Sequence, residues 1–201
     1  MKSKSVLAVV AATVVGAALL VPAVAAAEEH NTYFAVKFGP DFPTESNPLT
    51  AVSSSVQKWP TKYEVDGAIG NYWGFFGLQL SAGYLTTGTS DVDFKTWPIL
   101  LTARLRLPLG FIAPYAEGGA GVGISSFNVS SSGTASTKAG FAAIGGAGAD
   151  IYLGQFLLGA EFKYLWLDPG FSATQAGSAQ QAVEAFKFNG IVVQAYVGYM
   201  W

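Results

Sequence analysis

The residues of this chain that could do chemistry are charged side chains standing at alternate positions within apolar stretches. They are Lys37, Glu64, Asp66, Arg104, Arg106, Glu117, Asp150, Glu161 and Lys163. Alternate positions of a strand share one face, and an unpaired buried ion is costly, so we expect these charges to pair as a plug of salt bridges. The alternative is a gated polar path for water or small ions, in which Arg104 or Lys163 exchanges acidic partners.

The sequence lacks most of the residue types that usually carry out catalysis. His30 is the one histidine, it precedes the first apolar alternation, and the chain has no cysteine. We find no metal-ligand spacing, no phosphate-binding glycine loop and no nucleophile elbow. Glu64 and Asp66 remain as a carboxylate pair, but neighbours of this kind are ordinary on one strand face. The sequence therefore predicts no enzyme, no catalytic residue, no cofactor and no metal.

Period-two alternation predicts strands as the elements that position these charges. In the segment 94–107, Trp97, Ile99 and Leu101 alternate with Thr102, Arg104 and their neighbours. The same alternation marks eight segments, at 33–39, 61–70, 76–84, 94–107, 111–124, 139–152, 156–166 and 186–201. We expect Pro98 and Pro114 near rims or bulges, because proline cannot donate to a strand ladder.

The amino-terminal segment predicts export. A basic start is followed by an apolar run, Pro22 and small residues up to Ala27. This pattern is typical of a signal peptide at 1–27, with an uncleaved membrane helix as the rival interpretation. The remaining domain, 28–201, is acidic and has no basic patch for nucleic acid. The absence of cysteine excludes a lipoprotein anchor and a disulfide framework.

The links between strands alternate in length. Short links fall near Asn71, Pro108 and Leu153, whereas longer polar links include 40–60 and 168–185, the latter with room for a short helix at 175–185. Chain composition is 51% hydrophobic, yet no stretch after Ala27 is apolar enough for a membrane helix. These features predict an all-β fold, an eight-stranded antiparallel up-and-down transmembrane β-barrel with Tyr72 and Trp73 among its interfacial aromatics.

Other interpretations of the same pattern remain open. Inward Leu100, Leu157, Leu165, Val192 and Met200 could line a narrow conduit for small or apolar molecules. Small outward residues around Ala116 and Ala147 could form a docking groove, or could simply let a small barrel coil. A soluble, lipocalin-like binder would invert every assignment, with the apolar face inward and the charges outward.

The last strand carries a resemblance to a known family. Val197, Tyr199 and Trp201 form one face of a strand that finishes on an aromatic residue. This resembles the C-terminal signal of bacterial outer-membrane β-barrels, and the pattern of the whole chain is similar to the small barrels of the opacity and outer membrane protein A type. The enzymes of this fold depend on a histidine that has no counterpart here. Because the sequence ends at Trp201, we expect no peptidoglycan-binding domain.

The resemblance implies integral outer-membrane localisation, contact with outer-membrane lipid, and insertion by the barrel-assembly machinery through Val197, Tyr199 and Trp201. It also implies a non-enzymatic structural or surface-interaction role, with partners met through the loops 40–60 and 168–185. A narrow outer-membrane channel or transporter is the alternative.

Overall fold

The computed structural model describes residues 31–44, 61–88, 92–129, 134–168 and 188–201. The expected signal peptide at 1–27, the expected helix at 175–185 and most of the loops 40–60 and 168–185 lie outside these residues. Among the described residues, no helix is long and apolar enough to cross a membrane.

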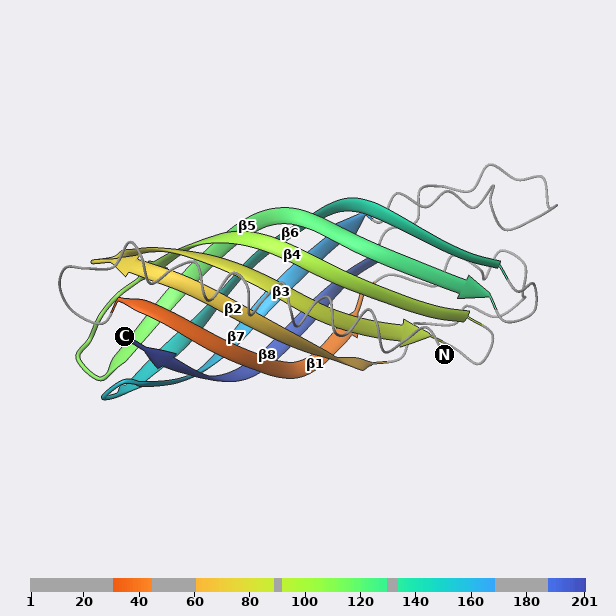
Figure 1. Ribbon diagram of the computed structural model, residues 1–201. Coiled ribbons are helices and arrows are strands. Elements are labelled where there is room, and N and C mark those ends of the chain that lie inside the picture. The colour runs from red at the N-terminus through yellow and green to blue at the C-terminus, as the bar shows by residue number, and fades with distance from the viewer. Residues whose placement is uncertain (1–30, 45–60, 89–91, 130–133, 169–187) are drawn as a thin grey trace.

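Eight antiparallel strands close into one barrel in chain order, as the sequence predicts (Figure 1). Each strand pairs with its neighbours in sequence, and β1 pairs with β8 to complete the circle. The strands are β1 (Thr32–Pro43), β2 (Lys62–Trp73), β3 (Phe76–Gly88), β4 (Val92–Arg106), β5 (Ile112–Val129), β6 (Thr134–Leu153), β7 (Phe156–Asp168) and β8 (Phe188–Met200). Closure leaves no unpaired sheet edge, which is the condition for a sheet to cross lipid.

The three short turns lie at one end of the barrel, which we call the short-turn end (Figure 1, left). They join β2 to β3, β4 to β5 and β6 to β7. Gly74, Gly110 and Gly154 adopt positive φ angles of 64°, 82° and 64° in these turns. Residues with a Cβ rarely adopt such angles, so glycine fixes the positions of the tight reversals.

Alternation separates the two faces of the barrel wall. Along β7, Glu161 and Lys163 are 3% exposed, whereas Phe162 between them is 53% exposed. The outer surface is accordingly apolar and the inner surface carries the charges. This distribution contradicts the lipocalin-like alternative, because a soluble barrel would have the opposite arrangement.

The lumen is filled in three layers. Along β7 the buried residues run from Leu157 through Glu161 and Lys163 to Leu165 and Leu167. β8 repeats the order, from Met200 and Tyr196 through Gln194 to Val192 and Phe188. A tyrosine-rich cluster therefore occupies the short-turn end, a charged layer the middle, and an apolar cluster the far end.

Several boundaries differ from the sequence-based expectation. β1 continues through Pro40 to Pro43, and β2 continues through Asn71 to Trp73. The Asn71 and Tyr72 positions are therefore strand residues, with the turn at Gly74 and Phe75. Tyr72 is also 0% exposed, because the inward face of β2 carries it into the lumen instead of the aromatic belt.

The two prolines behave differently. Pro114 lies two residues inside the start of β5, near the rim as expected. Pro98 lies in the middle of β4, so the expectation of a rim or bulge is wrong for it. The β3–β4 ladder instead omits two pairs between Ala82↔Ile99 and Leu85↔Thr96 and resumes in the same register. Proline lacks the N–H that the ladder would use there.

Candidate functional site

The candidate site is the charged layer of the lumen, with Glu161 at its centre. Glu161 Oε2 accepts hydrogen bonds from Lys37 Nζ at 2.7 Å, from Arg104 Nη2 at 3.0 Å and from the Tyr115 hydroxyl at 2.9 Å. Lys163 Nζ lies 3.6 Å from its other oxygen. One carboxylate of β7 thus binds side chains from β1, β4 and β5, because an eight-stranded barrel is narrow enough for side chains to span it.

Arg104 extends this centre along β4 and β5. Its Nε donates to Glu117 Oε2 at 2.9 Å, and its guanidinium carbon lies 4.2 Å from the centroid of the Tyr115 ring. Nη1 donates to the Tyr72 hydroxyl at 3.4 Å. The planar guanidinium presents several donors in fixed directions, so one buried arginine contacts three other strands, which are β2, β5 and β7.

Lys163 forms a second group of contacts towards the far end. Its ammonium donates to Asp66 Oδ2 at 2.7 Å, Glu64 Oε1 at 3.1 Å and Gln194 Oε1 at 2.9 Å. All three donor positions of the ammonium are therefore used. The lysine bridges β2, β7 and β8.

Asp150 and Arg106 are placed apart from these ion pairs. The Asp150 carboxylate accepts hydrogen bonds from the hydroxyls of Tyr72, Tyr152 and Tyr196. Arg106 lies over the Tyr72 ring at the short-turn end and donates to Gly74 O at 2.9 Å and to the Tyr152 hydroxyl at 3.0 Å. Three tyrosine hydroxyls thus satisfy the hydrogen-bonding capacity of the Asp150 carboxylate.

The five predicted lining residues are all buried, but they fall into two separate clusters. Leu100, Leu165 and Val192 pack with Phe94 and Phe188 at the far end, where the two phenylalanine rings stack at 5.4 Å. The other two, Leu157 and Met200, pack in the tyrosine-rich cluster. The charged layer lies between the clusters, so no continuous apolar path joins them in the described part of the lumen.

Sequence reasoning missed Asp41. It is 0% exposed, and neither of its carboxylate oxygens has a hydrogen-bond partner among the described residues. Lys37, Gly39 and Asp41 continue one alternating face of β1, and that alternation could have identified it. Pro40 led instead to the expectation of a loop. The buried tyrosines of the lumen were also left out of the predicted site.

The C-terminal residues lie on the outer face of the closing seam. Val197 pairs with Val36 and Tyr199 pairs with Phe34 across β1 and β8. The Trp201 N–H donates to Thr32 O at 3.0 Å, and Tyr199 and Trp201 stack at 6.4 Å. The predicted assembly residues are therefore in contact with the first strand.

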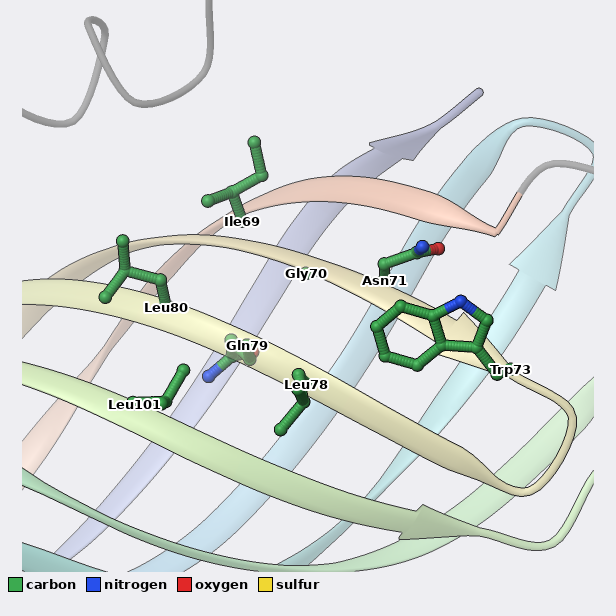
Figure 2. A pocket seen from close by; sticks show the side chains of 8 residues that line it. All are labelled: Ile69, Gly70, Asn71, Trp73, Leu78, Gln79, Leu80 and Leu101. Atoms are coloured by element: carbon green, nitrogen blue, oxygen red, sulfur yellow. The ribbon is translucent and has the colours of Figure 1, made fainter. Parts of the chain in front are cut away.

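A shallow apolar groove of about 250 Å³ crosses the outer wall of β2, β3 and β4 (Figure 2). Ile69, Leu78, Leu80 and Leu101 line it, and Trp73 and Asn71 stand together towards one end.

No group of three or more His, Asp or Glu side chains within the described residues is arranged to hold a metal ion.

Comparison with known proteins identifies the fold. No family model and no curated protein matches the sequence. Among solved structures, Neisserial surface protein A (NspA) matches with a TM-score of 0.59 and 14% identity, over 85% of this chain and 97% of that one. Ail, the attachment invasion locus protein of Yersinia pestis, matches with a TM-score of 0.47 and 15% identity, over 87% of this chain and 100% of that one. The N-terminal β-barrel domain of Pseudomonas aeruginosa OprF matches with a TM-score of 0.48 and 14% identity, over 87% of this chain and 100% of that one.

NspA and this chain share a similar backbone, and this chain has a closed eight-stranded topology, a filled polar lumen and an apolar outer wall. The chain therefore has the fold of the eight-stranded outer-membrane β-barrel proteins.

Proposed function

We propose that this protein is a non-enzymatic, non-conducting outer-membrane barrel that serves as a membrane anchor for its long connections. The loops 40–60 and 168–185 carry its surface interactions in this proposal. The barrel-assembly machinery inserts it by reading the closing strand, with Val197, Tyr199 and Trp201 as the contacted residues.

The observation that carries the proposal is the occupied lumen. Lys37, Arg104, Glu161 and Lys163 are each at most 3% exposed and hydrogen-bonded to one another or to shared partners. An ion crossing this layer would have to break several charge-assisted hydrogen bonds at once. Beyond the layer, the Phe94 and Phe188 rings stack within an apolar cluster that offers a permeating ion no polar partner.

Solute flux through reconstituted protein tests the closed lumen. We expect vesicles that contain the folded barrel to retain small ions and sugars as well as protein-free vesicles do. A matched pair of variants locates the barrier: Arg104→Ala removes the residue that joins Glu117 to Glu161, whereas Leu101→Ala shortens an outward side chain on the same strand. Steady solute release from the unmodified protein would contradict the proposal and favour the transporter alternative.

A further inference from the structure

Apolar exposure at the short-turn end continues beyond the strands onto the turns themselves. Phe111 is 70% exposed, Phe75 63%, Leu109 57% and Leu153 55%. Turns that face water are usually polar and rich in glycine, asparagine and aspartate. Here each of the three short turns carries a large exposed apolar side chain at or beside its tip.

These side chains are held on a hydrogen-bonded backbone. Leu109 N–H donates to Ile112 O at 2.8 Å, and the Phe111 and Phe75 carbonyls accept from the N–H groups of Tyr152 and Arg106, both at 2.8 Å. In the β6–β7 turn, Gln155 O accepts from the Met200 N–H at 2.7 Å. Each turn is thereby bonded within itself or to an adjoining strand. The apolar surface is thus a fixed feature of the folded barrel.

Charge is turned away from this surface. Arg106 is the one charged side chain near the three turns that is not fully buried, among the residues that the structure describes there. It points across the end of the lumen to Gly74 O and the Tyr152 hydroxyl. Partly exposed Lys95, Lys138 and Asp168 lie at the opposite end.

The height of the apolar wall shows where the turns fall. Ten residue steps separate Trp97 from Leu107, the last outward residue before the β4–β5 turn. At about 3.3 Å per residue and a tilt of about 40°, this distance is about 25 Å along the barrel axis, which is the full height of an apolar band. Leu109 and Phe111 therefore lie beyond that band and continue its apolar surface without a polar break.

We propose that the three short turns form an apolar collar that inserts into the interfacial layer of the lipid leaflet at this end. The collar consists of Phe75, Leu107, Leu109, Phe111 and Leu153. Lipid is the occupant because the collar is continuous with the lipid-facing wall and lacks charge. The barrel is then seated asymmetrically, with its short-turn end in lipid and its long connections in water.

Single-cysteine labelling tests the collar, since the natural chain has no cysteine to compete. Leu109→Cys and Phe111→Cys each carry an environment-sensitive fluorophore at the collar. Leu101→Cys reports the middle of the wall, and Thr61→Cys reports the opposite end, where its side chain is exposed. Each folded variant, checked by its heat-dependent gel mobility, is placed in phosphatidylcholine vesicles with or without bromine on the acyl chains near the headgroup.

We expect the Leu109 and Phe111 labels to show a blue shift, to lose intensity in the brominated vesicles, and to be protected from aqueous iodide. The Thr61 label should be quenched by iodide and not by bromine. Collar labels that behave like the Thr61 label would overturn the proposal. Protection that is lost when the protein is diluted into more lipid would also overturn it, because a second copy would then be the occupant.

The Leu101 label separates this inference from the membrane-anchor function. Bromine quenching at Leu101 with water exposure at Leu109 and Phe111 rejects the collar alone. Water exposure at Leu101 as well rejects insertion of the barrel itself, and the collar with it.

Discussion

At the scale of single residues, the lumen is a set of charges that depend on one another. Lys163 pairs with two carboxylates on β2, and Glu161 pairs with cations from three strands. Replacing a buried pair by apolar groups is often tolerated, whereas removing one partner leaves an uncompensated charge. The lumen residues should therefore respond to substitution as groups.

Lys163→Met is expected to lower the free energy of unfolding by about 3–5 kcal/mol, because it strands Glu64 and Asp66 in the barrel. Adding Glu64→Gln and Asp66→Asn should recover much of the loss. Urea unfolding in lipid vesicles, followed by gel mobility, measures both. Lys138→Met, at the partly exposed rim of β6, is the matched control and should change stability by less than about 1 kcal/mol. A triple variant no more stable than the single one would contradict the pairing.

At the scale of elements, the wall depends on close approach of neighbouring strands. Gly121 on β5 pairs with Leu100 on β4, and a Cβ on Gly121 would collide with Ile99 O. The obstacle is backbone within a paired ladder, so it cannot rotate aside as a side chain could. Gly118, on the outward face of the same strand, would place a Cβ 3.9 Å from Ile144 O, at ordinary contact distance.

Gly121→Ala is accordingly expected to destabilise the barrel by about 1–3 kcal/mol through overpacking, whereas Gly118→Ala should be nearly neutral. The midpoint of urea unfolding compares the two variants with the unmodified protein. Equal midpoints for both would show that β4 and β5 can separate without cost at this point.

The closing seam is a second element with its own prediction. Trp201→Ala removes an aromatic that stacks on Tyr199 at the β1–β8 junction. We expect slower insertion by the assembly machinery in cells and little change in stability once the barrel is folded. Phe162→Ala, which removes an exposed aromatic from β7, is the control for lost lipid contact. Pulse labelling with gel mobility gives the rates, and equal rates for the two variants would remove the special role of Trp201.

At the scale of the whole molecule, the two ends differ in chemistry. One end carries apolar turns that are hydrogen-bonded to the strands. At the other end, where the long connections join the strands, the charged side chains of Lys95, Lys138 and Asp168 are partly exposed. A barrel of this kind has a fixed direction in the membrane, because short turns and long loops belong to opposite sides.

This direction predicts the outcome of epitope tagging in intact cells. A tag inserted after Ser178 is expected to bind antibody without permeabilisation, whereas a tag inserted after Gly110 is expected to bind only after the outer membrane is opened. Heat-dependent mobility confirms that each tagged barrel has folded. The reverse labelling pattern would invert the direction and remove the surface role proposed for the loop 168–185.

The sequence by itself determined the wall of this protein. Period-two alternation in β4 and β7, with Arg104 and Glu161 opposite aliphatic neighbours, is a local property of a strand, and it predicted the two faces and the strand number. The tight turns followed from glycine at their tips. Pro40 and Asn71 led to wrong strand boundaries, because proline and asparagine are typical turn residues, whereas here they lie within β1 and β2.

Only the tertiary structure decided the partners within the lumen. Lys37 pairs with Glu161, which is 124 positions away in the sequence, and Lys163 donates to Glu64 and Asp66, which are 99 and 97 positions away. Those pairings depend on the stagger between strands that closes the barrel, and no local sequence pattern encodes this stagger.

Closure of the barrel also buried Tyr72 and Asp41 and separated the apolar lining into two clusters. It placed the three apolar turns together at one end.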